Sequence, residues 1–325
     1  MPKVSIIIPS YNRAEFIPAT LDSILSQSFK DFELIFVDDG STDNTEEILS
    51  KYSSEDSRVK YIKQANSERA VARSNGMKQA QGNYLALVDS DDIWYTNKLE
   101  KQIEVLESQP EIIFCYAAVN RINLDGKRVK TAPRQHQGHS GYIFSDLLIR
   151  NFIPSITPIF RREIFDKVGA QNTEFIPYED WDFWLRISLE GKFFHLKEAL
   201  GDYRLHPGQS VKNVKAEHIE KVTLAVLEKN TDITNQKLLE YLTQANCSID
   251  EFFATRDNAF SEAHLRIAYW YIVAGNLSKA NNHLAQAKAL SKKRNSDYRW
   301  WGLKTAQGLS SIAPAPVKEM LGAFH

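Results

Sequence analysis

The stretch NYLALVDSDDIW, residues 83–94, joins a buried strand to a cluster of acids. Its apolar run, residues 84–88, is typical of a short strand covered on both faces. The run ends at DSDD, which places three carboxylates in four positions. Such close like charges repel, and each loses solvation in an enclosed site. Alone, the segment fits either a solvated acidic turn or a ligand site.

Composition bounds the class of protein. The 325 residues suggest two domains or three, and a net charge of -1 gives no indication of nucleic-acid binding. The two cysteines, Cys115 and Cys247, argue against a disulfide framework and favour a reducing compartment. The N-terminal apolar run, residues 4–8, is too short for a signal peptide, and no stretch has the length of a membrane span. We expect a cytoplasmic protein, with peripheral contact at the inner face of a membrane left open.

Strands and amphipathic helices alternate through the first 90 residues. The expected strands are residues 4–8, 32–37, 59–62 and 84–88, and the expected helices are residues 14–27, 42–52 and 67–81. This alternation predicts an α/β fold with a mostly parallel sheet flanked by helices. Ligands bind such sheets outside the carboxyl ends of the strands.

Two of the expected strands end in acid at that edge. Asp38 and Asp39 follow FELIFV, and DSDD follows YLALV. A divalent cation is the simplest means of gathering these carboxylates, and oxygen ligands favour Mg²⁺ or Mn²⁺. The chain has neither GxxxxGK[ST] nor GxGxxG after a strand, which disfavours P-loop and Rossmann nucleotide sites. The kind of site that remains is one in which a metal ion binds the phosphates of a nucleotide.

Four segments carry a family resemblance: VSIIIPSYNR, ELIFVDDGSTDNT, ERAVARSNGMKQAQGNYLALVDSDD and YEDWDFWLR. Their order and spacing resemble the family 2 glycosyltransferases, which are inverting enzymes with a GT-A fold that use nucleotide-diphosphate sugars. The resemblance covers about residues 1–210, and the four segments are specific only together. It implies a nucleotide-sugar donor, a saccharide or glycolipid acceptor, and Mn²⁺ or Mg²⁺ as cofactor.

The resemblance assigns donor contacts near the first two strands. It places Pro9, Tyr11 and Asn12 against the base and ribose, although a simple turn also explains Pro9 and Asn12. Asp39 matches the acceptor for a base N–H, commonly uracil N3. Asp38 is expected to orient the following loop.

Two basic residues, Arg69 and Arg73, lie four apart and so on one helix face. The resemblance places a basic residue here near the nucleotide; the alternatives are a solvated face and a salt bridge. Ser41 and Thr42 suit a helix N-cap.

Within DSDD, the resemblance makes Asp91 the metal ligand at the diphosphate and Asp89 a ribose partner. Strand alternation would point these two side chains to the same side. Asp92 either shares the metal or caps a helix beginning near Trp94. In YRLH, Arg204 is a candidate diphosphate partner, and His206 is either a ligand of the metal or diphosphate or a structural histidine.

Glu179 and Asp180 begin a predicted amphipathic helix. Acids are favoured in a first turn by the helix dipole alone. By resemblance, Asp180 is the general base that deprotonates the acceptor hydroxyl, with Glu179 assisting and Asp182 as a weaker rival.

Residues 110–175 are the most irregular stretch, and His136 and His139 there fit an acceptor-side loop better than a metal site. We expect a GT-A domain at residues 1–212, with a nucleotide-sugar half at 1–110 and an acceptor half at 111–212. Residues 213–325 form a helical domain, with helices at 263–274 and 277–290 that resemble one tetratricopeptide unit. Packing, self-association and partner binding all stay open for it.

The aromatic residues of the C-terminus, Tyr298, Trp300 and Trp301, follow Lys292, Lys293 and Arg294. They suit either a membrane interface or the packing of a terminal helix.

The predicted function is metal-dependent, inverting sugar transfer. The family resemblance implies a UDP-sugar as donor and a role in cell-surface polysaccharide biosynthesis. A sugar nucleotidyltransferase is one alternative, but its glycine- and lysine-rich loop is absent after VSIIIP. A non-catalytic binding or scaffold protein that retains the fold is the other. The intact Asp39, Asp91 and Asp180 argue against it.

Overall fold

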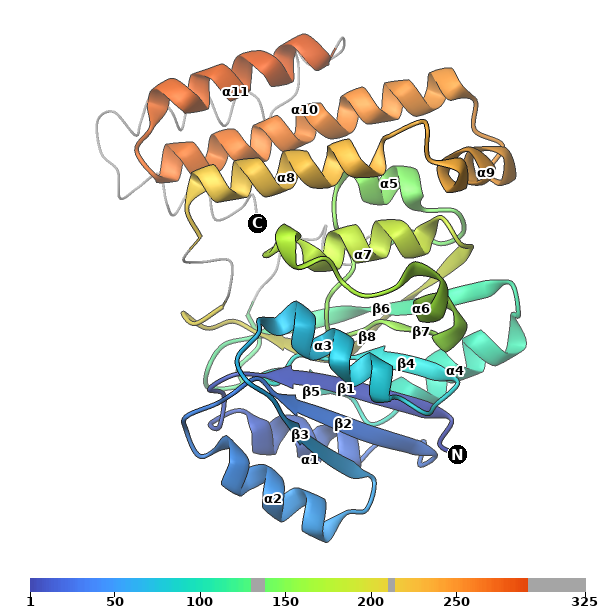
Figure 1. The fold of residues 1–325 in the computed structure, drawn as a ribbon, viewed down its shortest axis with the longest axis vertical. Coiled ribbons are helices and arrows are strands. Elements are labelled where there is room, and N and C mark those ends of the chain that lie inside the picture. Colours follow the sequence, from blue (N-terminus) through green and yellow to red (C-terminus); the bar gives the residue numbers. More distant parts are fainter. Residues whose placement is uncertain (130–137, 210–213, 292–325) are drawn as a thin grey trace. The chain divides into compact units, whose positions relative to one another are not determined.

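The computed structural model describes residues 1–129, 138–209 and 214–291, and these form two units. The first unit comprises Met1–Ile143 and Phe152–Gln209, and it holds the sheet. The second comprises Phe144–Asn151 and Ser210–His325, and its described elements are helices (Figure 1). The segment Phe144–Asn151 therefore groups with the C-terminal helices, although it lies inside the expected acceptor half.

One eight-stranded sheet runs through the first unit in the order β3-β2-β1-β4-β7-β6-β8-β5. Parallel pairing joins β1 to β2 and β4, β2 to β3, and β6 to β8, whereas β7 and β5 run antiparallel to their neighbours. The strands are β1 (Val4–Ser10), β2 (Phe32–Asp38), β3 (Val59–Lys63), β4 (Tyr84–Leu87), β5 (Ile93–Trp94), β6 (Ile112–Ile122), β7 (Ile159–Arg161) and β8 (Lys192–Arg204). The mostly parallel sheet is confirmed.

Pro9 lies inside β1, although the sequence predicted that the strand would end there. The Ile7 carbonyl accepts from Val88 N on the β4 side, and the Ser10 carbonyl accepts from Asp39 N on the β2 side. This alternation turns the missing donor of Pro9 toward the β4 side, just past the end of that strand. No ladder hydrogen bond is lost, so β1 continues and delivers Tyr11 beyond the sheet edge.

Helices cover both faces of the sheet (Figure 1). On one face, Ile6 and Ile8 of β1 pack in a core with Ile17, Leu21 and Leu99. The other face carries α3, where a Cβ on Gly76 would lie 2.6 Å from Ile7 Cγ2. The helices of this unit are α1 (Ile17–Leu25), α2 (Thr45–Glu55), α3 (Arg69–Gln79), α4 (Lys98–Ser108), α6 (Arg162–Val168) and α7 (Glu179–Ser188), with the 3₁₀ helix η2 (Thr173–Phe175).

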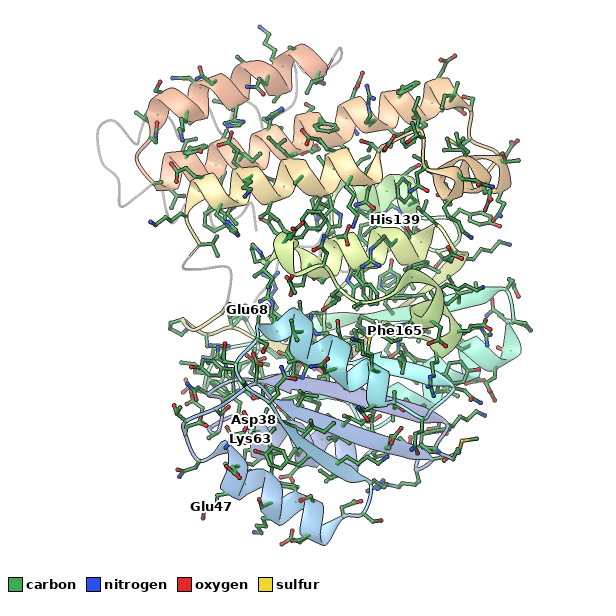
Figure 2. All side chains as sticks on the ribbon, viewed as in Figure 1. Asp38, Glu47, Lys63, Glu68, His139 and Phe165 are labelled. Atoms are coloured by element: carbon green, nitrogen blue, oxygen red, sulfur yellow. The ribbon has the colours of Figure 1, made fainter. Side chains whose placement is uncertain are left out.

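The stretch expected to be irregular, residues 110–175, contains regular elements where it is described. It holds β6, β7, α5 (Phe144–Ile149) and α6. Most of β6 is buried, so its sequence shows no alternation that would mark a strand. His139, labelled in Figure 2, donates its backbone N–H to Tyr116 Oη at 2.7 Å. His136 lies outside the described residues.

The second unit contains α5, α8 (Ala216–Asn230), α9 (Gln236–Gln244), α10 (Ile249–Val273) and α11 (Leu277–Leu290). A capping box at Ser248 starts α10 well before the predicted helix, and Gly275, with φ +78°, makes the turn into α11. The two helices pack through Ala268, Tyr271 and Ala280. The tetratricopeptide likeness stays a prediction.

Two expectations concern membranes. Among the residues that the structure describes, no helix has the length and apolar character needed to cross one. The aromatic and basic positions of the C-terminus, Lys292, Lys293, Arg294, Tyr298, Trp300 and Trp301, lie outside the described residues.

A lysine in the core of the first unit gives a stability prediction. The side chain of Lys98 is fully buried, and its Nζ has no hydrogen-bond partner in the described part of the chain. The Nζ lies 3.8 Å from the Trp94 ring centroid. Burial holds the pKa of Lys98 well below its usual range. We expect Lys98→Met to raise the free energy of unfolding by about 1–3 kcal/mol at pH 7, the usual cost of burying an unpaired polar group.

The measurement is urea denaturation at pH 7 and pH 9.5. Below the ordinary lysine pKa the unfolded chain binds a proton that the folded chain lacks, so this group makes stability rise with pH. Lys98→Met should lose that rise, whereas Lys101→Met on the same helix should keep it. A less stable Lys98→Met would contradict the prediction.

Candidate active site

The carboxyl ends of β1, β2 and β4 meet at one edge of the sheet, because these strands are parallel neighbours. Asp38 ends β2 and is fully buried (Figure 2). Its Oδ1 accepts from Ser41 N at 2.8 Å and its Oδ2 from Tyr61 Oη at 2.9 Å. Asp38 thus orients the following loop, in agreement with the expectation.

Asn12 ties the loop after β1 to the loop after β2. Its backbone N–H donates to Ser41 Oγ at 2.9 Å, and its Oδ1 accepts from Thr42 N at 2.8 Å. Its φ of +51° is one that asparagine tolerates. Ser41 and Thr42 do not cap α2, as the sequence had suggested: the N-cap of α2 is Asn44, because the two earlier residues are used in this loop contact.

Asp39 keeps one oxygen for a ligand. The residue is 3% exposed, and its Oδ1 accepts from Gln64 Nε2 at 2.7 Å and Ser67 N at 2.9 Å. Within the described part of the chain, its Oδ2 has no hydrogen-bond partner. One positioned acceptor is suited to an N–H edge. Tyr11 lies on the same loop edge and is 47% exposed, whereas Pro9 is buried.

Asp89 and Asp91 have separate partners. Asp89 accepts from Arg73 Nη2 at 2.7 Å and from Ser155 Oγ at 2.9 Å. Burial raises the pKa of Asp89, but the charges of Arg73 and Arg69 and the hydrogen bonds outweigh it, so the net pKa is lowered. The strand-alternation argument for these two acids is wrong, because β4 ends at Leu87, before either of them.

Asp91 lies beside a histidine 115 positions along the chain. His206 Nε2 is 2.9 Å from Asp91 Oδ2, and Arg13 Nε is 3.7 Å from the same oxygen. Arg13 also donates to the Gly208 carbonyl at 2.8 Å. The described residues contain no group of three or more His, Cys, Asp or Glu side chains placed to hold a metal. Asp91 and His206 are close enough to supply two ligands, which would leave substrate oxygens and water to complete the set, as is common for Mg²⁺.

Asp92 is the acid with an unused buried oxygen. It is 1% exposed, its Oδ1 accepts from Arg204 N at 2.8 Å, and its Oδ2 has no partner among the described residues. Burial, with the charges of Asp91 and Asp89, raises the pKa of Asp92 well above its usual range. A cation at this turn would favour the ionised form of Asp92 and counter the repulsion from Asp91 and Asp89, so the donor set fits a divalent metal.

Asp92 does not cap a helix, as one alternative had it. The next helix, α4, begins at Lys98 with Asn97 as its N-cap, because β5 intervenes. Arg204 instead clamps the acidic turn: its Nε donates to the Asp91 carbonyl at 2.9 Å.

The first turn of α7 carries Glu179 and Asp180. Asp180 is partly exposed, and its Oδ1 accepts from Trp181 N at 2.7 Å. Burial and the charge of Glu179 raise the pKa of Asp180 to about 6, against the opposing charges of Arg69 and Arg73. A carboxylate of that pKa is largely ionised at neutral pH and is more basic than an ordinary aspartate, which suits a general base.

Arg69 and Arg73 share one face of α3, as expected, and both are in ion pairs rather than solvated. Arg69 binds both oxygens of Glu179, and Arg73 Nη1 lies 3.6 Å from Glu179 Oε1. Asp182, the rival base, is fully buried and pairs with Arg186 at 2.9 Å.

Two contacts escaped the sequence reading. Arg13 ends the quoted VSIIIPSYNR segment, so its place beside the candidate donor loop was a signal that could have been used. Ser155, which binds Asp89, lies in a stretch without motif content and gave no signal.

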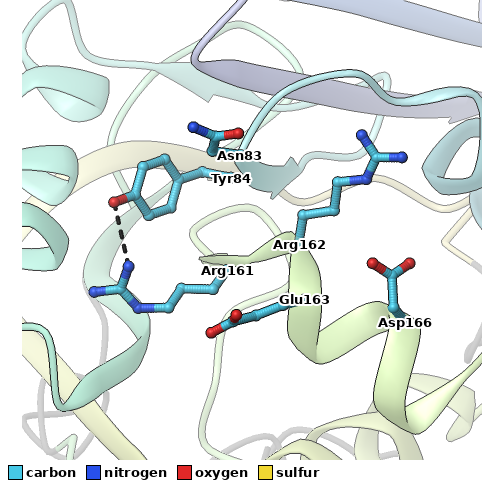
Figure 3. A pocket seen from close by; sticks show the side chains of 6 residues that line it. All are labelled: Asn83, Tyr84, Arg161, Arg162, Glu163 and Asp166. Atoms are coloured by element: carbon cyan, nitrogen blue, oxygen red, sulfur yellow. Dashed lines mark hydrogen bonds between the residues drawn. The ribbon is translucent and has the colours of Figure 1, made fainter.

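A separate pocket lies away from these acids. It has a volume of about 370 Å³ and is lined by Asn83, Tyr84, Arg161, Arg162, Glu163 and Asp166 (Figure 3). It surrounds the amino end of β4, whereas DSDD follows the carboxyl end. One of its two arginines, Arg161, donates a hydrogen bond from Nη1 to Tyr84 Oη at 3.4 Å. This pocket is not part of the candidate active site.

Comparison with known proteins identifies the family. The model of glycosyl transferase family 2 matches residues 5–169. The chain belongs to glycosyl transferase family 2. A Bacillus subtilis (strain 168) family relative, TuaG, whose name assigns it to teichuronic acid biosynthesis, is 34% identical over 208 residues, covering 63% of this chain and 79% of TuaG. An uncharacterized glycosyltransferase of Rickettsia felis is 38% identical over 208 residues; the match covers 63% of this chain but 33% of that protein.

Solved structures support the fold. Staphylococcus aureus TarS 1-349, crystallised with UDP, gives a TM-score of 0.59 at 18% identity, over 94% of this chain and 91% of that one. The mannosyltransferase PcManGT of Pyrobaculum calidifontis, in complex with GDP-Man and Mn²⁺, gives 0.59 at 17% identity, over 99% and 84%. The predicted GT-A fold with a helical C-terminal region is confirmed, and the chain is a glycosyltransferase of family 2.

Proposed function

We propose that this family 2 glycosyltransferase is metal-dependent and inverting. It transfers a sugar from a nucleoside-diphosphate donor, a UDP-sugar in first place, to a hydroxyl of a saccharide or glycolipid in cell-surface polysaccharide biosynthesis. The observation that carries this is the pairing of Asp91 Oδ2 with His206 Nε2 at 2.9 Å, beside the unpartnered buried oxygen of Asp92. TuaG supports the polymer class by its name, and TarS supports UDP by its complexes with UDP and UDP-GlcNAc.

Residues at the carboxyl ends of β1, β2 and β4 contact the base and ribose of the donor. Asp39 Oδ2 accepts the N–H of the base, with Tyr11, Pro9 and Asn12 forming the loop around base and ribose. Asp89 accepts from ribose hydroxyls, aided by Arg73. Guanine is the alternative base, because PcManGT binds GDP-Man and the guanine ring also presents an N–H to an acceptor.

The diphosphate lies against the DSDD turn. Asp91 and His206 would hold Mn²⁺ or Mg²⁺, with Asp92 as a further ligand once the cation favours its ionised form. Arg13 and Arg204, which both contact Asp91, supply cationic donors. When bound, the cation supplies Lewis-acid compensation for the charge on the leaving diphosphate.

Asp180 carries the proton transfer. It removes the proton from the acceptor hydroxyl as that oxygen forms a bond to the anomeric carbon of the sugar. The bond from this carbon to the diphosphate oxygen breaks on the opposite face, so the configuration inverts and an α-linked donor gives a β-linked product. The proton leaves on Asp180, and the nucleoside diphosphate departs.

The domain roles follow from the same proposal. Residues 1–110 form the nucleotide-sugar half and residues 111–212 the acceptor half, from which His206 and Arg204 reach the diphosphate. Residues 213–325 form a helical domain for packing, self-association or a partner protein.

The test is donor binding and hydrolysis across UDP-, GDP- and dTDP-sugars, with and without Mn²⁺. We expect one nucleotide class to bind in the presence of Mn²⁺ and to lose at least about tenfold in affinity when the metal is chelated, which corresponds to 1.4 kcal/mol. Absence of binding by every donor under Mn²⁺ and Mg²⁺ would overturn the proposal.

A further inference from the structure

The hydrogen bonds of the Arg69 guanidinium all go to the start of α7. Its Nε and Nη2 both contact the carboxylate of Glu179, and Nη2 also donates to the Pro177 carbonyl at 3.0 Å. Glu179 is 1% exposed, whereas the Arg69 side chain is 28% exposed, so the carboxylate of this ion pair is buried and its guanidinium is partly accessible to solvent. A bidentate arginine–carboxylate pair fixes orientation as well as distance.

The two anchors of Arg69 bracket the start of a helix. Pro177 lies just before α7, and Glu179 is its first residue. The next residue is Asp180, so the backbone that carries the general base is held on both sides of Tyr178. Small displacements of a reacting group are costly, about 10²-fold in rate for 1 Å.

Arg73 completes the arrangement from one turn further along α3. Its Nη2 is bonded to Asp89, and its Nη1 lies 3.6 Å from Glu179 Oε1 and 3.2 Å from Gln171 Oε1. If Arg69 is removed, Glu179 therefore still has a cation near it. Arg69 can thus be tested without leaving Glu179 wholly unpaired.

We infer that Arg69 is a positioning residue for acceptor deprotonation, which holds Asp180 in place through Pro177 and Glu179 and does not contact the nucleotide. The inference rests on the proposed function, in which Asp180 is the base. It replaces the donor-binding role that the sequence suggested for Arg69.

The experiment is a pH profile of kcat, together with donor KM and nucleotide affinity, for Arg69→Gln. In the wild type, the charge of Arg69 lowers the pKa of Asp180. Removing that charge should raise this pKa, so the acid limb of the profile should move to higher pH. We expect kcat at neutral pH to fall by about 10–100-fold from displacement of the base. Donor KM and nucleotide affinity should stay within about twofold, a change of less than half a kcal/mol.

Two further variants sharpen the test. Glu179→Gln removes the negative neighbour of Asp180, so its acid limb should move in the opposite direction, to lower pH. Arg69→Lys keeps the positive charge but loses the bidentate contact with Glu179. Compared with Arg69→Gln, it should return the acid limb to its wild-type position but recover only part of kcat.

The matched control is Arg186→Gln. Arg186 also anchors α7, through Asp182 and the Val168 and Ala170 carbonyls, on contacts that do not involve Asp180. It should lower stability and leave the acid limb unchanged.

Weaker nucleotide binding by Arg69→Gln with an unmoved acid limb would overturn the inference and return Arg69 to the donor site. Equal limb shifts in Arg69→Gln and Arg186→Gln would reduce Arg69 to a structural role. A wild type that transfers from no donor would instead refute the proposed function, which is a separate result.

Discussion

Asp91→Asn should lose metal-dependent donor binding and lower transfer by at least about 10³-fold, because the turn then lacks the carboxylate that we propose as the metal ligand. In the structure, Asp91 Oδ2 is shared by His206 Nε2 at 2.9 Å and Arg13 Nε at 3.7 Å. The asparagine preserves the shape of the side chain and its contact with His206. It removes only the negative charge that a divalent cation requires.

The measurement is titration of wild type and variant with the donor, in Mn²⁺ and after chelation. Asp56→Asn is the matched control, because Asp56 is also a partly buried aspartate paired with an arginine, Arg58, but lies before β3 at the amino end of the sheet. The control should bind the donor as wild type does. Retention of Mn²⁺-dependent binding by Asp91→Asn would assign the metal to another acid of DSDD, with Asp92 next in order.

Asp180→Asn should abolish transfer while leaving donor binding intact. An amide cannot accept the hydroxyl proton, and loss of a general base typically costs about 10²–10⁴-fold in rate. Because the pKa of Asp180 is raised to about 6, wild-type kcat should fall as pH drops through that value. In this pH range, Asp180→Asn should show only a low residual activity that does not depend on pH.

The neighbouring acid supplies the control. Asp182 lies in the same turn, but it is fully buried and bonded to Arg186, so it cannot reach an acceptor. Asp182→Asn should lower the melting temperature and keep the pH profile of the wild type. If Asp182→Asn, and not Asp180→Asn, lost transfer with donor binding preserved, the base would be Asp182 and the proposed mechanism would be wrong.

The sequence by itself was sufficient for the parallel half of the fold. The runs that form β1, β2 and β4 are largely apolar because parallel strands are buried on both faces, and such runs stand out in any chain. Their shared direction also brings Asp39 and DSDD to one edge without further information. The region from β6 to β8 was harder to read, since buried strands with register shifts leave neither alternation nor turn signals.

The partners of each acid were decided only by the tertiary structure. Asp91 meets His206, 115 positions away, and Glu179 meets Arg69, 110 positions away. Neither pairing has a local signal, because each depends on how elements from separate parts of the chain pack together: the loops after β4 and β8 in one case, and the helices α3 and α7 in the other. Three acids are separated by burial and by nearby charge: the pKa of Asp89 is lowered, and those of Asp92 and Asp180 are raised. Sequence determined which carboxylates gather at the edge, and folding set the charge that each one carries there, since desolvation and Coulomb interactions depend on distance in space.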